Sequence, residues 1–321
     1  MFDWQHEAER LVTQLGSERI RDAVNTLSNA YREGRNTRAA RLDDEALIAA
    51  YLSVRFPATR AANLSVAKAI VQTLASRLPD SQWTPASLLD LGAGCGAGAL
   101  AFSEIWPGLA RITALERLPA MVELGKQILP EATWQTGNFD TPATFAPHDV
   151  VLLSYSLGES DKFPLAAAWQ AATQLLVIVE AGTPKGFETI LRARKELLSA
   201  GASLLAPCPA DEKCPAAGVD WCHFSARLNR SALHRRLKGG TLGYEDEKFS
   251  YLAAWRGALP VGAPRIIRHP VTHPGRIDLE LCEAPARGVL TVTKRYPKLF
   301  KIARKLDWGD GYILEKNSGG S

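Results

Sequence analysis

A glycine-rich loop is the segment of this chain whose residue types point most directly to chemistry. The run DLGAGCG at residues 90–96 ends a short apolar segment and precedes a helical pattern. Glycines allow a backbone to approach a ligand that side chains would exclude, and the start of a helix offers backbone N–H groups without internal partners. In open α/β sheets, ligands bind at the carboxyl ends of the strands, where such loops lie. The loop therefore predicts a site for a nucleotide-containing cofactor.

The loop is compatible with two cofactors, a dinucleotide and S-adenosylmethionine, and the acidic residue at its start distinguishes them. Gly92, Gly94 and Ala97 also satisfy the relaxed dinucleotide fingerprint, and Glu116, at the end of the next predicted strand, suits a ribose diol in either case. Asp90 stands two residues before the first glycine, where an acid can face a cationic amino-acid group. A dinucleotide gives no charge reason for that acid. The pattern favours S-adenosylmethionine, with a dinucleotide or a vestigial, empty loop as alternatives.

Four of the five cysteines form a second candidate site. Cys208, Cys214 and Cys222 share one proline-rich loop, and Cys282 follows at the end of a predicted strand. The N-terminus lacks the basic start and apolar segment of an export signal, so we expect the cytoplasm, where structural disulfides are rare. Four thiolates can hold zinc or an iron–sulfur cluster. The spacing leaves both metals open, and unrelated buried cysteines are the alternative to a metal site.

The elements that must position these groups change in type along the chain. Residues 1–82 carry apolar residues at three- and four-residue spacing, which predicts a helical region divided at Pro57. Residues 83–206 alternate short apolar runs with helical stretches, which predicts a doubly wound α/β domain around a parallel sheet.

The remainder of the chain has a different pattern. Residues 207–312 begin with the cysteine loop, and continue with a predicted basic helix over 227–238, three strands, and a short basic helix at 296–306. Residues 313–321 read as a flexible polar tail. We therefore expect an α/β domain with an N-terminal helical region and a C-terminal, cysteine-rich extension.

Charge is distributed unevenly along the chain. Residues 227–306 hold 17 Lys and Arg against 6 Asp and Glu, a net charge of +11, whereas residues 1–226 hold 20 against 25. A basic region of this size favours a polyanionic partner, first of all a nucleic acid. Arg235, Arg236 and Lys238 form a basic run that ends in glycines, and they are the predicted phosphate contacts. No apolar run approaches the length of a membrane span, so we expect no membrane partner. We also expect the chain to be a monomer.

The glycine loop, D-x-G-x-G-x-G, resembles the first motif of class I S-adenosylmethionine methyltransferases, and the turn after the third strand resembles their adenine-contacting turn. The residues expected to bind the cofactor are Asp90, Gly92, Gly94, Gly96, Glu116, Asn138, Phe139 and Ser154. Amino-methylating members carry an Asn/Asp-Pro-Pro-aromatic turn after the fourth strand, where this chain has Ser-Tyr-Ser-Leu. Methyl transfer can proceed largely by alignment of the reactants, so catalysis stays open and no catalytic residue is assigned.

A longer resemblance covers most of the chain, from about residue 45 to 310. The runs VEAGTPKGF, APCPADEKCP, DWCHFSARLNRSALHRRLKGG and TKRYPKLFKIARKLDWGD resemble the methyltransferase-like proteins of the mitochondrial small ribosomal subunit and their bacterial relatives. The resemblance implies a [4Fe–4S] cluster on Cys208, Cys214, Cys222 and Cys282, and a role on small-subunit ribosomal RNA. It leaves two functions: an S-adenosylmethionine-dependent RNA methyltransferase, or a non-catalytic assembly factor that binds RNA with the fold and the cluster.

Overall fold

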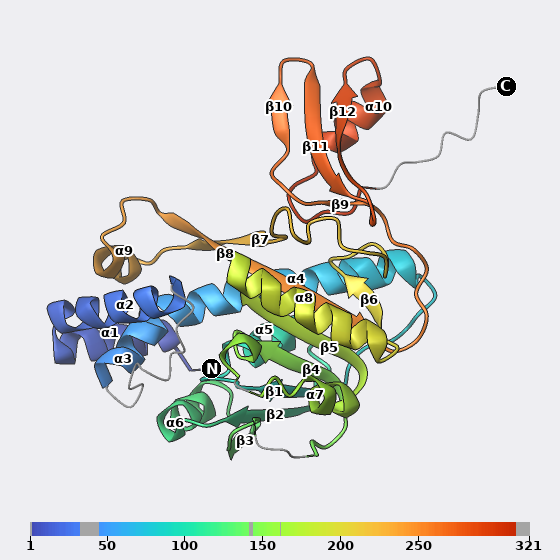
Figure 1. The fold of residues 1–321 in the computed structure, drawn as a ribbon. Helices are drawn as coiled ribbons and strands as arrows, with labels where there is room; N and C mark the ends of the chain where they lie inside the picture. The colour runs from blue at the N-terminus through green and yellow to red at the C-terminus, as the bar shows by residue number, and fades with distance from the viewer. Residues whose placement is uncertain (1, 33–44, 141–143, 161, 313–321) are drawn as a thin grey trace.

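The computed structural model describes residues 2–32, 45–140, 144–160 and 162–312, and a mixed sheet forms its centre (Figure 1). Within these residues the sheet has eight strands, in the order β3-β2-β1-β4-β5-β8-β6 with β7 paired to β8. The strands are β1 (Ser87–Leu91), β2 (Arg111–Glu116), β3 (Thr133–Thr136), β4 (His148–Ser154), β5 (Ala172–Ala181), β6 (Ser203–Ala206), β7 (Phe224–Asn229) and β8 (Tyr244–Trp255).

Strand order and direction identify the fold. β1 pairs in parallel with β2 and β4, and the pairs β2–β3 and β4–β5 are also parallel. β8 lies between β5 and β6 and runs antiparallel to both. A parallel sheet with one reversed strand inserted near its edge is the arrangement of class I methyltransferases, so the predicted α/β class I fold is confirmed. Because β7 and β8 come from residues beyond 206, the C-terminal part of the chain completes this sheet.

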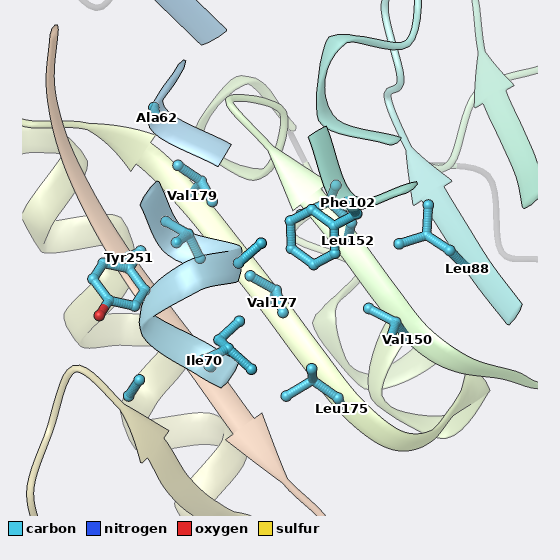
Figure 2. Close-up of a cluster of buried hydrophobic side chains, with 14 of the residues drawn as sticks. Ala62, Ile70, Leu88, Phe102, Val150, Leu152, Leu175, Val177, Val179 and Tyr251 are labelled. Carbon is cyan, nitrogen blue, oxygen red and sulfur yellow. The ribbon is translucent and has the colours of Figure 1, made fainter. Parts of the chain in front are cut away.

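Helices cover both faces of the sheet, which explains the near-continuous apolar strands. The helices of this part are α4 (Phe56–Arg77), α5 (Ala97–Ile105), α6 (Pro119–Ile128), α7 (Leu165–Ala171) and α8 (Pro184–Ser199). Figure 2 shows one core, in which Ile70 of α4 lies beside Val177 of β5. The next residue, Ile178, points to the opposite face and packs in a second core with α7 and α8. Successive strand residues alternate between faces, so each inner strand contributes to two cores.

The N-terminal helices α1 (Trp4–Leu15), α2 (Ser17–Arg32) and α3 (Glu45–Ala50) form a further core, to which α9 (Ala232–Lys238) also contributes. A π-helical turn at residues 51–55 joins α3 directly to α4. The prediction that Pro57 divides two helices is therefore wrong. Pro57 lies in the first turn of α4, directly after the π-helical turn, where a proline interrupts no regular α-helical hydrogen-bond ladder.

The predicted helix over residues 227–238 is wrong in its first half. Phe224, Ala226 and Leu228 are buried while the residues between them are more exposed, and this two-residue period places them on β7. The helix α9 begins after Ser231, whose side chain accepts a hydrogen bond from the backbone N–H of His234.

A second, smaller sheet follows β8. Within the described residues it contains β9 (Arg265–Ile266), β10 (Val271–His273), β11 (Arg276–Cys282) and β12 (Arg287–Thr293). The helix α10 (Pro297–Ala303) covers its apolar face, which is built from Ile277, Leu279 and Val292. Figure 1 shows this small sheet and α10 standing apart from the main sheet. Among the described residues, no helix combines the length and apolar character needed to cross a membrane.

Candidate functional site

The glycine loop joins β1 to α5, and its backbone requires glycine. Gly92, Gly94 and Gly96 have φ angles of 77°, 56° and 90°, in the left-handed region that other residues rarely adopt. A Cβ atom on Gly92 would also lie 2.6 Å from the Cβ of Ser156. The backbone N–H of Gly92 donates to the carbonyl of Leu115 at 2.9 Å, which holds the loop against the end of β2. The loop therefore presents bare backbone at the carboxyl end of β1.

Glu116 ends β2, and two backbone N–H groups fix its carboxylate. Its Oε2 accepts from Gly94 and its Oε1 accepts from Leu118, both at 2.9 Å. The residue is 7% exposed, and burial raises the pKa of its carboxyl above the ordinary value. Each carboxylate oxygen has capacity for a further hydrogen bond. The group can therefore accept from the hydroxyls of a ribose that enters beside the loop.

A cavity opens at the carboxyl ends of four parallel strands, and six of the eight predicted cofactor residues line it. They are Gly92 and Gly94 after β1, Glu116 of β2, Asn138 and Phe139 after β3, and Ser154 of β4. Asn138 shapes its turn, because its Oδ1 accepts from the backbone N–H of Asp140 at 2.9 Å. The fold thus brings to one place residues that lie far apart in the sequence.

The other two predicted residues, Asp90 and Gly96, are not among the residues that line this cavity. Asp90 lies behind the loop, where burial raises its pKa to about 7. Its Oδ2 accepts from the N–H of Ala99 at 3.2 Å, whereas its Oδ1 has no hydrogen-bond partner among the described residues, as is also true of Oδ1 of Asn63. Asn63 donates to Ser154 Oγ at 2.8 Å. Buried acceptors without donors are costly, and neither Asp90 nor Asn63 is among the residues that line the cavity.

The N-terminal helices also contribute to the cavity, which the sequence analysis missed. Tyr51 of the π-helical turn and Thr59 of α4 line it, and the Tyr51 hydroxyl lies 3.2 Å from the place of a Cβ on Gly94. Tyr155 also lines it, with a φ of 55°, and its hydroxyl donates to Glu247 of β8 at 3.3 Å. Helical periodicity marks Tyr51 and Thr59 as helix residues and gives no signal that they meet the glycine loop.

Cys95 lies within the glycine loop and is unsuited to attack a substrate. Its side chain is fully buried in the N-terminal core. Burial raises the pKa of its thiol far above the ordinary value, and the thiolate is the nucleophilic form. The residue is therefore a small packing group beneath the loop.

The four predicted metal ligands line a second cavity, which lies between α8, the loop after β6 and the small C-terminal sheet. Cys208, Cys214 and Cys222 come from the loop, Cys282 comes from the end of β11, and all four are free thiols. Burial raises the pKa of Cys208 to about 11 and raises the pKa of Cys222 and Cys282, so these thiols are protonated at neutral pH. Within the described residues, no three His, Cys, Asp or Glu side chains form a group that could hold a metal ion.

Two buried arginines line the cysteine cavity without a carboxylate partner. Arg194 and Arg265 are 9% and 6% exposed, and no described carboxylate lies within ion-pair distance of either. Their guanidinium groups donate to backbone carbonyls, Arg194 to Asp211 at 3.2 Å and Arg265 to Pro207 at 3.1 Å. A buried charge without a counter-charge is unfavourable. The arginines therefore suit a cavity whose thiols become anionic when they bind a metal.

The predicted RNA contacts lie on α9, and one of them has an acidic partner. Arg235 and Arg236 are exposed, whereas Lys238 forms an ion pair with Glu245 of β8. His234, on the same helix, contacts the other oxygen of that carboxylate at 2.9 Å. The acidic strand β8 therefore reduces the positive charge that α9 presents.

Comparison with known proteins places the chain in a family. The family model described as mitochondrial small ribosomal subunit Rsm22 matches residues 45–313. The human mitochondrial ribosome assembly protein METTL17 is 27% identical over 265 residues, which cover 73% of this chain and 57% of that protein. Rsm22-cox11 tandem protein 2 of Schizosaccharomyces pombe, a mitochondrial protein, is 26% identical over 301 residues, which cover 71% of this chain and 38% of that protein. The matches therefore span less than two thirds of the length of these relatives.

Solved structures also resemble the chain, at low sequence identity. The plantazolicin methyltransferase BpumL, in complex with a monoazolic desmethylPZN analogue and SAH, is 12% identical with a TM-score of 0.42, covering 74% of this chain and 99% of that chain. The assignment of the fold rests on the strand order described above. Because the family model matches most of its residues, this chain belongs to the Rsm22 family.

Proposed function

We propose that this chain binds S-adenosylmethionine in the cavity at the carboxyl ends of β1–β4. The convergence of loops from four strands on that cavity carries the proposal. The bare backbone of the glycine loop admits the amino-acid end of the cofactor, Glu116 accepts from its ribose, and the Asn138–Phe139 turn offers an amide and an aromatic ring to its adenine. When bound, the cofactor supplies an electrophilic methyl group.

The chain acts, in this proposal, on the RNA of the small ribosomal subunit during assembly. Membership of the Rsm22 family and similarity to a human ribosome assembly protein support this role. The first candidate activity is methyl transfer to that RNA. The second is non-catalytic assembly, and one observation supports it. The segment at the end of β4, residues 154–157, reads Ser-Tyr-Ser-Leu and lacks the Pro-Pro turn of amino-methylating enzymes.

Mapping of ribosomal RNA modifications distinguishes the two activities. Small subunits are isolated from cells that lack the protein, and from cells that express the wild type, Glu116→Ala, or the control Glu123→Ala. Glu123 is an exposed glutamate on α6 that does not line the cavity. A methyl group that depends on the wild type and is absent with Glu116→Ala supports methyl transfer. Restored assembly with Glu116→Ala, and no methyl group that depends on the protein, supports the non-catalytic function.

We also propose that the cysteine cavity holds an iron–sulfur cluster. Four free thiols line one cavity, yet no three of the described side chains are grouped for a single ion. A four-iron cluster takes one thiolate for each iron, and this cavity supplies four cysteines. The buried arginines match the negative charge of a cluster with four thiolates.

Elemental analysis of anaerobically purified protein tests the cluster. We expect iron and acid-labile sulfide, and loss of both in Cys282→Ser, because metal binding is coupled to folding of the site. The matched control, Cys95→Ala, removes a thiol from outside the cavity and should retain the cluster. Zinc without iron or sulfide in the wild type would reject the cluster in favour of a zinc site.

A further inference from the structure

The cations near the C-terminus are concentrated on and around α10, and no acid interrupts them. Residues 294–305, KRYPKLFKIARK, contain six Lys and Arg and no Asp or Glu. The six are Lys294, Arg295, Lys298, Lys301, Arg304 and Lys305, and all are exposed. Within the described residues, none of the six forms an ion pair.

Helical spacing gathers part of this charge on one face. Lys298 and Lys301 are one turn apart on α10, and Lys305 follows in the turn that continues the helix. On the other side of α10, Ala303 is buried and Leu299 packs against the small sheet. Like charges at three- and four-residue spacing destabilise a helix. The exposed face of α10 therefore gains stability when an anion covers it.

Elsewhere in the basic region, acids of β8 pair with three of the cations. Arg227 pairs with Asp246 at 2.8 Å, Arg230 pairs with Glu245 at 3.1 Å, and Lys238 pairs with the same Glu245. A count of charges along the sequence cannot show this pairing. The positive charge that stays available to a partner therefore lies mainly on α10 rather than on α9.

We propose that the surface formed by residues 294–305 is where the chain binds RNA, through the phosphates of the RNA backbone. The proposal rests on the proposed role on the small ribosomal subunit. Tyr296 lies among these cations and is 58% exposed, so its ring is available for stacking with an unpaired base. RNA fits better than a membrane surface, because an interfacial helix exposes large apolar side chains, whereas Leu299 and Phe300 pack against the small sheet.

Salt-dependent binding of transcribed small-subunit ribosomal RNA tests this surface. The α10 variant carries Lys298→Gln, Lys301→Gln and Lys305→Gln. A control that removes the same charge from exposed positions on α4, α6 and α8 carries Lys68→Gln, Lys126→Gln and Lys195→Gln. An α9 variant carries Arg235→Gln and Arg236→Gln. Circular dichroism verifies that each variant is folded, and filter binding at several salt concentrations gives the slope of log K against log salt.

The α10 variant should flatten the salt slope by up to about 0.9 for each lost phosphate contact, while the control retains the wild-type slope. Equal slopes for the wild type and the α10 variant would overturn the proposal, as would flattening by the α9 variant alone. Vesicles of phosphatidylglycerol and phosphatidylcholine provide the membrane arm. Lysine-dependent vesicle binding with unchanged RNA binding would also overturn it. If the wild type binds no RNA, both this surface and the proposed role on the small subunit are rejected. If the wild type binds RNA and the α10 variant has the same salt slope, only this surface is rejected.

Discussion

Replacing Gly92 by alanine should destabilise the protein through two separable effects. The first is the backbone, because a φ of 77° is left-handed and costs a non-glycine residue about 1–2 kcal/mol. The second is packing, because the new Cβ would lie 2.6 Å from the Cβ of Ser156, and overpacking typically costs about 1–3 kcal/mol. We therefore expect Gly92→Ala to lower the free energy of unfolding by about 2–5 kcal/mol, a large share of the ~5–15 kcal/mol of a typical domain.

Urea denaturation followed by circular dichroism measures this loss, and Gly201→Ala is the matched control. Gly201 has a φ of 79° and nothing within 4 Å of its Cβ position, so its loss should be the backbone cost of about 1–2 kcal/mol alone. A double-mutant cycle with Ser156→Gly isolates the contact, and we expect a coupling energy of about 0.5–3 kcal/mol. Equal losses at Gly92 and Gly201, together with an additive cycle, would refute the proposed packing of the loop against Ser156.

Three further predictions concern charged and titratable groups. Burial raises the pKa of Glu180 from 4.5 to about 8, so between these two pH values the folded chain retains a proton that the unfolded chain releases. The stability of the protein should therefore fall as the pH rises from about 4.5 to about 8. Glu180→Gln should make the midpoint of urea unfolding less dependent on pH in this range. Burial acts to raise the pKa of Glu245, but hydrogen bonds from His234 and Lys238 hold it far below its ordinary value of 4.5. The ionised carboxylate therefore stabilises the folded chain above that pH, and this stabilisation is lost on acidification. Glu245→Gln should lose less stability in acid than the wild type does, and an unchanged dependence of stability on acid would contradict this. Arg194→Gln should weaken retention of the proposed iron–sulfur cluster by about 10–100-fold, measured as iron per chain after incubation with a chelator. Unchanged retention of iron would exclude a role for this charge.

Much of the fold could be predicted from the sequence, because its strands are apolar and its loops are rich in glycine. The near-continuous apolar runs at Leu88–Leu91 and Val150–Leu153 indicate burial on both faces, which only a covered parallel sheet provides. The insertion of β8 between β5 and β6 could not be predicted, because strand order depends on long-range packing. Helical periodicity likewise predicts a break at Pro57, and it gives no sign of the π-helical turn at residues 51–55 that joins α3 to α4.

The candidate site could be predicted in part, where its residues follow strands. Gly92 follows β1, Glu116 ends β2 and Asn138 follows β3. Parallel topology brings such positions to one edge of the sheet. Tyr51 could not be identified, because its place in the cavity depends on how α3 and α4 pack against the sheet. The ion pair between Lys238 and Glu245 could not be predicted either, since the net charge of a region does not reveal which of its cations have acidic partners.

Calorimetric titration of the purified protein with S-adenosylmethionine tests the central claim most directly. Glu116→Ala should weaken binding by about 1.5–3 kcal/mol, the range for hydrogen bonds to a charged group, while the exposed control Glu123→Ala should bind as the wild type does. One cofactor bound per chain, with this loss in Glu116→Ala, is the result that we predict. No binding of S-adenosylmethionine by the wild type would contradict the account.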